Sequence, residues 1–327
     1  MIGFQYTRVK DDKAVFNALK NANTKIIAGG SNLIDLMKKG IENPEKLVDI
    51  NHLPYREIKF DQDILHIGAL ALNSTVSEHE MVLTHHPLLA KALKSGASQQ
   101  IRNVATIGGN IMQRTRCSYF YNPEMPCNKR DLGAGCSAKE GFNRMHAIFG
   151  TSDSCIAVHP SDMCVALAAL DAMIIVKSAK GSRRVPILEF LRLPEDRPDK
   201  DTNLKNGEMI IGIDTPRNNF QRYNHYLKHR DRASYAFAVI SVAAALELDG
   251  DLIKDVRLAM GGVAHKPWRL SEGENFLKGK KATVENFQQA AALGMNGAKG
   301  YGHNDFKLTL APNAIIEALK TASTGRA

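Results

Sequence analysis

The chain has 327 residues, of which 44% are hydrophobic and 24% charged, so it can bury a sizeable core divided among two or three domains. Its 25 glycines and 12 prolines are an average share and no low-complexity tract occurs, which excludes the collagen-like and disordered classes. The longest apolar stretches lie near residues 164–170 and 236–246 and are far shorter than the roughly 18 residues that a membrane span needs. The sequence therefore predicts a globular protein without a membrane span.

Forty-three Lys and Arg against 34 Asp and Glu give a formal charge of +9. No run of five basic residues occurs and only 6% of the residues are aromatic, so the interleaved aromatic and basic side chains of a nucleic-acid-binding module are missing. We therefore expect no nucleic acid as a partner and interpret the excess charge as a solvated basic surface. Residues 1–10 show neither a signal-peptide pattern nor a twin arginine. This predicts folding in the cytoplasm, with the periplasm reached only by co-export with a signal-bearing partner.

The first half of the chain alternates between strand and helix patterns. Apolar spacing and turn residues predict helices at 11–22, 33–39, 75–83 and 87–97 and strands at 25–28, 47–50 and 64–68. Residues 112–143 have few apolar positions and no period, and unstructured loops of this length are uncommon in compact domains unless something holds them. We expect one domain over 1–57 and a second over 58–215, with an insertion at about 112–156.

The second half begins with a predicted helix at 161–172, a strand at 173–178 and a polar connection at 194–206. The pattern changes after residue 216, where 226–230, 236–248 and 253–260 read as strands or a strand and helix mixture, and 285–295 and 311–322 as helices. We expect a third domain over 216–327.

Two glycine-rich loops are candidate ligand sites. The first, Ala28-Gly29-Gly30-Ser31-Asn32-Leu33, joins a predicted strand to a helix, where bare backbone and free amides suit a phosphate. The second contains Gly108-Gly109-Asn110. Either can instead be an ordinary tight turn with a helix-capping side chain. The spacing is not that of a Rossmann dinucleotide loop, but two such loops fit a cofactor that contains a pyrophosphate.

All five cysteines fall within 48 residues, at Cys117, Cys127, Cys136, Cys155 and Cys164. Cys164 lies in a predicted apolar helix, where a buried free thiol is the usual outcome, whereas the other four lie on or just after the unexplained loop. Four thiols can bind zinc, bind an iron–sulfur cluster or form two disulfides, and a cytoplasmic chain argues against disulfides. Their intervals match neither zinc knuckles nor ferredoxin motifs, so spacing alone does not identify the metal.

Four segments carry a resemblance to a known family: 28–33, 102–111, His-Pro-Ser-Asp-Met at 159–163, and Gly-Gly-Val-Ala-His-Lys-Pro-Trp-Arg at 261–269. With them the chain resembles the FAD-binding subunits of the xanthine dehydrogenase and carbon-monoxide dehydrogenase group of molybdenum hydroxylases over almost its whole length. The cysteine-bearing insertion resembles a narrower set, the flavin subunits of periplasmic aldehyde oxidoreductases and of 4-hydroxybenzoyl-CoA reductase, which carry an additional [4Fe–4S] cluster. The implied fold is α+β, the FAD-binding type-2 fold of vanillyl-alcohol oxidase and xanthine dehydrogenase flavin domains, with a C-terminal α+β domain.

The resemblance also implies roles for individual residues. The pyrophosphate loop would be Ala28, Gly29, Gly30, Ser31, Asn32 and Leu33. Contacts to the rest of FAD would come from Thr106, Gly109 and Asn110 at the ribityl chain or phosphate, Ser161 and Asp162 at the ribose, the backbone of Ile211 at the adenine, and Lys228 near the isoalloxazine ring. The cluster would be ligated by Cys117, Cys127, Cys136 and Cys155, with Cys164 as an alternative fourth ligand.

In such complexes the substrate is oxidised at a molybdenum centre on another polypeptide, and iron–sulfur centres pass electrons to FAD and on to an external acceptor. The expected partners are therefore a [2Fe–2S] subunit and a molybdenum cofactor-binding subunit, and we expect no catalytic acid, base or nucleophile in this chain. The alternatives are a self-contained flavin oxidoreductase with a structural cysteine loop and a basic nucleic-acid-binding protein with a structural zinc or iron–sulfur site.

Overall fold

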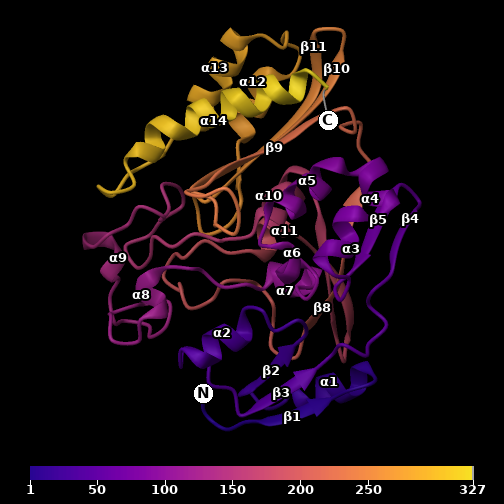
Figure 1. Cartoon of the computed structure of the whole chain (residues 1–327), viewed down its shortest axis with the longest axis vertical. Helices are drawn as coiled ribbons and strands as arrows, with labels where there is room; N and C mark the ends of the chain where they lie inside the picture. Colours follow the sequence, from indigo (N-terminus) through magenta and orange to yellow (C-terminus); the bar gives the residue numbers. More distant parts are fainter. Residues whose placement is uncertain (326–327) are drawn as a thin grey trace.

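The computed structural model describes residues 1–325 and contains three separate β-sheets that follow one another along the chain (Figure 1). The first sheet, at the N-terminal end, is parallel with strand order β1-β3-β2. Its elements are β1 (Gln5–Arg8), α1 (Asp12–Ala18), β2 (Thr24–Ile27), α2 (Leu33–Lys38) and β3 (Lys46–Asp49). Apolar side chains around Val15, Val48 and Ile50 form its small core.

The second sheet is antiparallel, with order β4-β5-β8-β6-β7, and holds the middle of the chain together. Its strands are β4 (Ile58–Asp61), β5 (Ile64–Gly68), β6 (Met173–Ser178), β7 (Gly181–Pro186) and β8 (Met209–Pro216). Its helices are α3 (Asn73–Glu78), α4 (Glu80–His85), α5 (Pro87–Ser95), α6 (Gln99–Arg102), α7 (Ile107–Ile111), α10 (Asp162–Ala169) and α11 (Ile187–Phe190). Every residue of α10 is buried, which makes this helix the centre of the largest core cluster.

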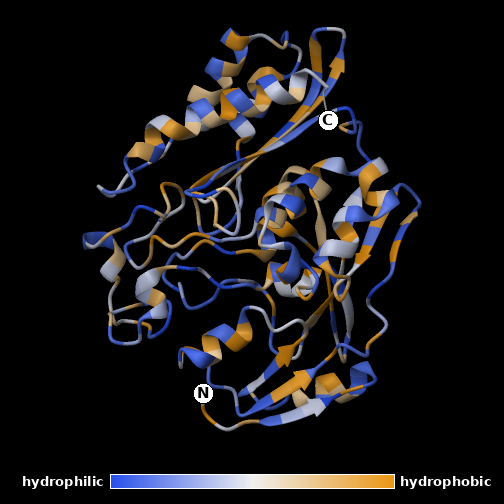
Figure 2. Ribbon diagram, in the orientation of Figure 1, coloured by the Kyte–Doolittle hydropathy of each residue, from blue (hydrophilic) through white to orange (hydrophobic). Residues whose placement is uncertain are grey.

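The insertion between α7 and α10 projects to one side of the molecule (Figure 1). It contains only two single-turn helices, α8 (Ser118–Tyr121) and α9 (Ser137–Glu140). The prediction of a largely irregular segment is therefore confirmed. Its blue and white ribbon in Figure 2 shows how few of its residues are apolar.

The third sheet is antiparallel, with order β12-β11-β10-β9, and one of its faces is covered by helices (Figure 1). Its elements are β9 (Tyr223–His229), β10 (Ile240–Asp249), β11 (Leu252–Gly261), β12 (Trp268–Arg269), α12 (Ser271–Leu277), α13 (Val284–Gly294) and α14 (Phe306–Ser323). The separation of sheets from helices confirms the predicted α+β class. No helix within residues 1–325 combines the length and apolar character of a membrane span.

Several predicted elements have different limits in the structure. The single helix predicted at 75–83 is wrong: the backbone at His79 is extended, and its ring accepts a hydrogen bond from the amide of Met81, which starts α4 anew. α14 begins five residues before the predicted Ala311 and includes Pro312, so packing against the third sheet outweighs the cost of an internal proline.

Candidate functional site

A large cavity lies between the first sheet and the helices of the middle part of the chain and has a volume of about 1250 Å³. It exceeds the usual range for small-ligand pockets and so has room for a dinucleotide. Eleven of the thirteen residues predicted to bind the cofactor line it: Ala28, Gly29, Gly30, Ser31, Asn32, Leu33, Thr106, Gly109, Asn110, Ser161 and Asp162. The two exceptions are Ile211 and Lys228, which lie outside the lining.

The two glycine loops touch each other at Gly29. A Cβ atom on this residue would lie 2.1 Å from the carbonyl oxygen of Val104, which leads into the second loop. No side chain fits at that distance, so a bare backbone is required where the loops cross. The next residue, Gly30, has a φ of +69°, a left-handed conformation that glycine adopts without strain. The geometry therefore explains why glycine occupies both positions. The close contact at Gly29 holds the two loops together as one wall of the cavity.

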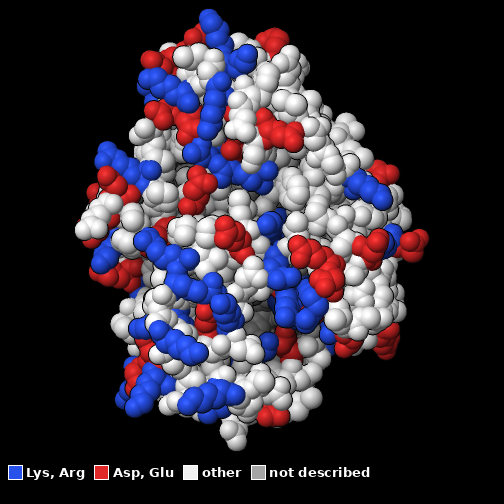
Figure 3. All heavy atoms as spheres, turned by 180° about the vertical axis from the view of Figure 1, so that it is seen from behind, with Lys and Arg blue, Asp and Glu red and all other residues white. Residues whose placement is uncertain are grey.

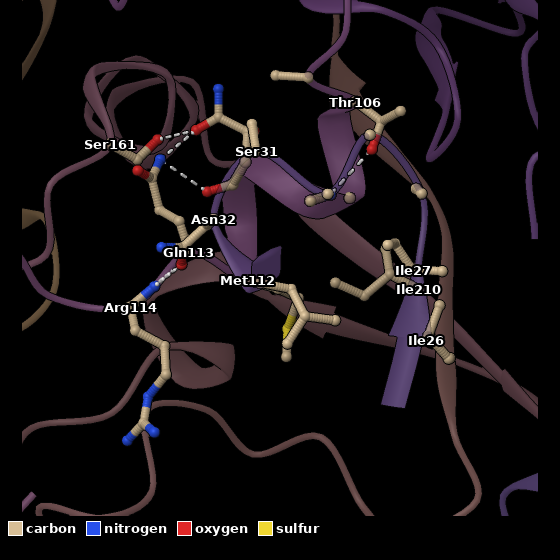
Figure 4. Close-up of a pocket in the computed structure, with 18 of the residues that line it drawn as sticks. Ile26, Ile27, Ser31, Asn32, Thr106, Met112, Gln113, Arg114, Ser161 and Ile210 are labelled. Carbon is tan, nitrogen blue, oxygen red and sulfur yellow. Dashed lines mark hydrogen bonds between the residues drawn. The ribbon is translucent and has the colours of Figure 1, made fainter. Parts of the chain in front are cut away.

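A network of polar side chains forms one end of the cavity (Figure 4). Ser161 Oγ donates to Asn110 Oδ1 over 2.7 Å, and Gln113 Nε2 donates to the same oxygen over 2.7 Å. Ser161 also caps α10 by accepting a hydrogen bond from the amide of Cys164. Ser161, Asn110 and Gln113 are fixed by one another, so the polar end is preorganised. Thr106, which lies on the other side of the view in Figure 4, caps α7 by accepting from the amide of Gly109.

The opposite end of the cavity is apolar. Figure 4 shows Ile26, Ile27 and Ile210 together on that side, with Met112 between them and the polar residues. Ile210 lines the cavity, whereas its neighbour Ile211, predicted to contact the adenine through its backbone, does not. Ile211 has no partner residue on β6, because the register shifts there, and its carbonyl accepts a hydrogen bond from Ala69. An apolar end next to a polar one suits a flat ring attached to a phosphate chain.

Lys228 acts on the cavity through Asp162. Its ammonium group lies 2.8 Å from Asp162 Oδ2, and Tyr226 donates its hydroxyl hydrogen to Asp162 Oδ1 over 2.8 Å. All three side chains are buried, and burial raises the pKa of Tyr226 far above its ordinary value, so the phenol stays protonated. The pair holds the carboxylate of Asp162 at the start of α10, facing the cavity.

The cavity lining favours an anion. Seven acidic side chains contribute to it, and in the described residues all but Asp35 pair with a cation: Glu42, Asp162, Asp199, Asp201, Glu208 and Asp231. Five lining cations have no carboxylate partner within residues 1–325: Lys20, Arg102, Arg116, Lys205 and Arg232. Figure 3 shows Lys and Arg gathered around a hollow on one face of the molecule. The unpaired cations suit a pyrophosphate.

The insertion brings four thiols together in a second, small cavity. It is lined by Cys117, Cys127, Cys136 and Cys155. Its volume is about 10 Å³, room for about one water molecule. No three His, Cys, Asp or Glu side chains within residues 1–325 converge closely enough to hold a single metal ion. Cys164 lies elsewhere, fully buried inside α10 as expected.

The four thiols differ in their tendency to ionise. Burial raises the pKa of Cys117 to about 11. The hydrogen bond from Cys155 lowers the pKa of Cys136 to about 6, and the same bond raises the pKa of Cys155. His146 Nε2 lies 3.1 Å from Cys117 Sγ, and burial lowers the pKa of His146 to about 4, so its ring is neutral. The hydrogen bond between Cys136 and Cys155 therefore favours the thiolate on Cys136 over that on Cys155.

A buried network of charges joins the two cavities. Lys129 lines the thiol cavity and forms an ion pair with Asp201, which lines the large cavity. Arg114 bonds Asp201 through Nε over 2.9 Å and Glu42 through Nη1 over 2.8 Å. Burial alone would raise the pKa of Asp201, but the charges of Lys129 and Arg114 hold it far below its ordinary value. The network fixes the insertion against the wall of the large cavity.

Sequence reasoning missed three charged or polar residues that shape these sites: the buried His146 and Lys307, and the partly buried Asp201. Lys307 donates to the carbonyl oxygens of His146 over 2.9 Å and Gly262 over 2.7 Å. Burial lowers the pKa of Lys307 to about 7. None of the three belongs to a motif, and their partners are distant in sequence, so no sequence signal could have singled them out.

Comparisons with known proteins agree with this geometry. Residues 2–218 match the FAD binding domain in molybdopterin dehydrogenase, and residues 225–322 match the CO dehydrogenase flavoprotein C-terminal domain. The chain is 42% identical to the aldehyde oxidoreductase FAD-binding subunit PaoB of Escherichia coli, over 98% of this chain and 99% of that subunit. It is 31% identical to the glyceraldehyde dehydrogenase medium chain of Sulfolobus acidocaldarius, over 85% of this chain and 82% of that one.

Among solved structures, a chain of the carbon monoxide dehydrogenase from Hydrogenophaga pseudoflava superposes with a TM-score of 0.78 and 25% identity, covering 100% of both chains. The expected resemblance is therefore confirmed, and so is the FAD cofactor. This chain belongs to the FAD-binding subunits of the molybdenum hydroxylase family, as an oxidoreductase subunit that binds FAD.

Proposed function

We propose that this chain is the electron-transfer subunit of a molybdenum-containing aldehyde oxidoreductase complex and that it carries a [4Fe–4S] cluster in addition to FAD. One observation carries the proposal: a four-thiol cavity and a dinucleotide cavity lie at the two ends of one buried ion-pair network, Lys129–Asp201–Arg114. The high identity to the Escherichia coli subunit supports aldehydes as the substrates of the complex.

The large cavity fits FAD. The crossing at Gly29, where a Cβ would overlap the carbonyl of Val104, leaves backbone open to a phosphate chain. We assign Ala28–Leu33 to the pyrophosphate, and Thr106, Gly109 and Asn110 to the phosphate or ribityl chain. Ser161 and Asp162 then face the ribityl or ribose hydroxyls, Ile210 with the neighbouring backbone of Ile211 the adenine, and Lys228 acts near the isoalloxazine through Asp162.

The thiol cavity fits a cluster in the chemistry of its donors. Backbone amides donate to three of the four sulfurs: those of Tyr119 and Phe120 to Cys117, those of Ala138 and Lys139 to Cys136, and that of Ala157 to Cys155. Hydrogen bonds to sulfur are among the means by which proteins tune iron–sulfur clusters. Each of four irons would take one thiolate, so the sulfurs need not converge on one point as they must for zinc. We assign Cys117, Cys127, Cys136 and Cys155 as ligands, which move apart to admit the cluster.

When bound, the cluster carries one electron at a time and FAD two, which lets the subunit match one-electron donors to its acceptor. The chain's own residues bind and orient these groups. The cavity cations attract the pyrophosphate, the polar network around Asn110 fixes its position, and the Lys129–Asp201–Arg114 network holds the two sites at a constant separation. We assign no acid, base or nucleophile of aldehyde oxidation to this chain.

The donors of the electrons lie on other chains. We propose a [2Fe–2S] subunit and a molybdenum cofactor-binding subunit as permanent partners, which implies large interfaces. Within this chain we propose three units at 1–57, 58–215 and 216–327, with the iron–sulfur insertion at about 112–156. Three separate sheets support this division.

The test is the iron and flavin content of the chain produced together with its partner subunits. We expect one FAD and about four irons, shown by flavin bands with a broad iron–sulfur shoulder. Cys127→Ala should remove the iron and leave most of the flavin. Cys164→Ala is the matched control, because this thiol is buried outside the cavity and should be neutral for iron. Flavin without iron in the wild-type complex would favour a self-contained flavin oxidoreductase with a structural cysteine loop and refute the cluster.

A further inference from the structure

Lys307 is an unusual residue because it is fully buried and has no acidic partner. Its side chain is 0% exposed, and within residues 1–325 no Asp or Glu oxygen pairs with its ammonium group. The group donates instead to two carbonyl oxygens, those of His146 and Gly262. Burying a cation without a counter-charge is costly, and lysine is almost never fully buried unless it is paired. The position therefore calls for a negative charge that these side chains do not supply.

A candidate for that charge is the four-cysteine cavity. Lys307 Nζ lies 2.9 Å from the carbonyl of His146, and the ring of the same histidine lies 3.1 Å from Cys117 Sγ. One residue thus separates the ammonium group from the thiol. The other buried lysine at this cavity, Lys129, is already neutralised by Asp201. Lys307 is thus a buried amine close to this cavity whose charged form has no carboxylate partner among the described residues.

The surroundings hold Lys307 in place. Asn304, just before α14, donates to the carbonyls of His146 over 3.3 Å and Ala147 over 3.0 Å. The side chain of Asn143 donates to the carbonyl of Tyr301 over 2.7 Å. The start of α14 is therefore tied to the last part of the insertion, which fixes the distance between the ammonium group and the thiols.

We propose that Lys307 is the counter-cation of the cluster on Cys117, Cys127, Cys136 and Cys155 and that it raises the reduction potential of that cluster. The inference rests on the proposed function, because it requires the cluster. A thiolate-ligated cluster is net negative, and its one-electron reduction adds a further negative charge. A fixed positive charge stabilises the reduced form more than the oxidised form, so it makes reduction easier. Lys307 is a positioning residue in this role, since it acts through the field and through His146.

The substitution Lys307→Gln separates charge from hydrogen bonding. Glutamine keeps an N–H donor for the two carbonyls but removes the positive charge. Lys307→Arg keeps the charge and changes the shape. Lys91→Gln is the matched control: Lys91 is half-buried, donates to the carbonyl of Asn224 over 2.9 Å, has no acidic partner in the described chain, and lines none of the cavities described.

The measurement is a redox titration of the cluster in the whole complex, followed by electron paramagnetic resonance, with iron and FAD content measured alongside. For Lys307→Gln we expect the ratio of reduced to oxidised cluster at a fixed potential to fall about tenfold, a shift of 59 mV to more negative values for a one-electron couple. Lys307→Arg and Lys91→Gln should keep the wild-type potential. If Lys307→Gln loses iron while Lys307→Arg retains it, the requirement for charge is also supported.

Two results would overturn the inference: a wild-type potential in Lys307→Gln, or loss of iron in both Lys307 variants, which would show that the site needs the shape of lysine and not its charge. A wild-type complex without iron is a different outcome, because it would refute the proposed cluster itself.

Discussion

The crossing of the two glycine loops at Gly29 makes a strong prediction for Gly29→Ala. The new methyl carbon would lie 2.1 Å from the carbonyl oxygen of Val104 and 2.8 Å from its carbonyl carbon, both of them backbone atoms. A flexible side chain cannot move aside here, so the loops themselves must separate. Since we assign both loops to FAD, we expect the free energy needed to restore their original distance to reduce the free energy of FAD binding.

The size of the effect follows from the cost of overpacking, which is typically about 1–3 kcal/mol. The dissociation constant of FAD should therefore rise about 5- to 150-fold. The assay is titration of flavin-free protein with FAD, followed by quenching of flavin fluorescence. Gly3→Ala is the control, because a Cβ at that glycine meets nothing within 4 Å. An unchanged dissociation constant for Gly29→Ala, with or without a loss of stability, would show that the crossing does not shape the binding site.

Three further predictions concern buried charges. Asp201→Asn leaves Lys129 buried without its counter-ion, so the free energy of unfolding should fall by about 3–5 kcal/mol in denaturant titrations, whereas Asp199→Asn, at a half-exposed pair, should change it little. Lys228→Met leaves the buried carboxylate of Asp162 at the cavity wall without its counter-ion, so both the stability of the fold and the affinity for FAD should fall. Full FAD affinity in this variant would rule out the role of Lys228 in FAD binding. Acid should also destabilise the fold, because burial lowers the pKa values of four histidines, to about 4 for His86, His146 and His159 and to about 3 for His265. These histidines gain protons near pH 6.5 only on unfolding, so the free energy of unfolding should fall as pH falls from 6.5 towards 4, by about 5 kcal/mol per pH unit, and a flat profile from pH 7 to 5 would contradict this.

The sequence predicted best what depends on local pattern. The strands at β5 and β6 have the predicted limits, because alternating or continuous apolar runs end there at clear turn residues. β8, the central strand of the middle sheet, was not predicted. Gly212 interrupts its apolar run, and only the structure shows why: the register shifts at this point, and a Cβ would lie 3.0 Å from the carbonyl of Ile67.

The candidate site was predictable where a motif carries it. Both glycine loops are candidate ligand sites from composition and position alone, with ordinary tight turns as the alternative, and the structure places them on one cavity. The contact that makes Gly29 necessary joins residues 75 positions apart, and the pairing of Lys129 with Asp201 joins residues 72 apart. Pairings over such separations depend on the tertiary fold, and a single sequence contains no periodicity that reveals them.

The insertion shows why an ordered loop is by itself weak evidence for a bound metal. The length of this loop, some thirty residues, predicts that something holds it, and the cysteines are the predicted cause. The structure provides another cause. Arg130 donates to the carbonyl oxygens of five residues, namely Tyr119, Phe120, Asn122, Pro123 and Met125. Asn128 accepts from the amides of Gly133 and Gly135 and donates to the carbonyl of Ser154.

These hydrogen bonds hold the loop without any bound group, so the order of the loop is not by itself a sign of a cluster. Hydrogen bonds from Arg130 and Asn128 account for the path of the backbone, but they give no reason for four thiols to share one cavity or for Lys307 to be buried without a counter-charge. Both features are costly or improbable in a loop that is merely structural, and a thiolate-ligated cluster accounts for both at once. Iron content and cluster potential are therefore the decisive measurements, since the order of the insertion would be the same in either case.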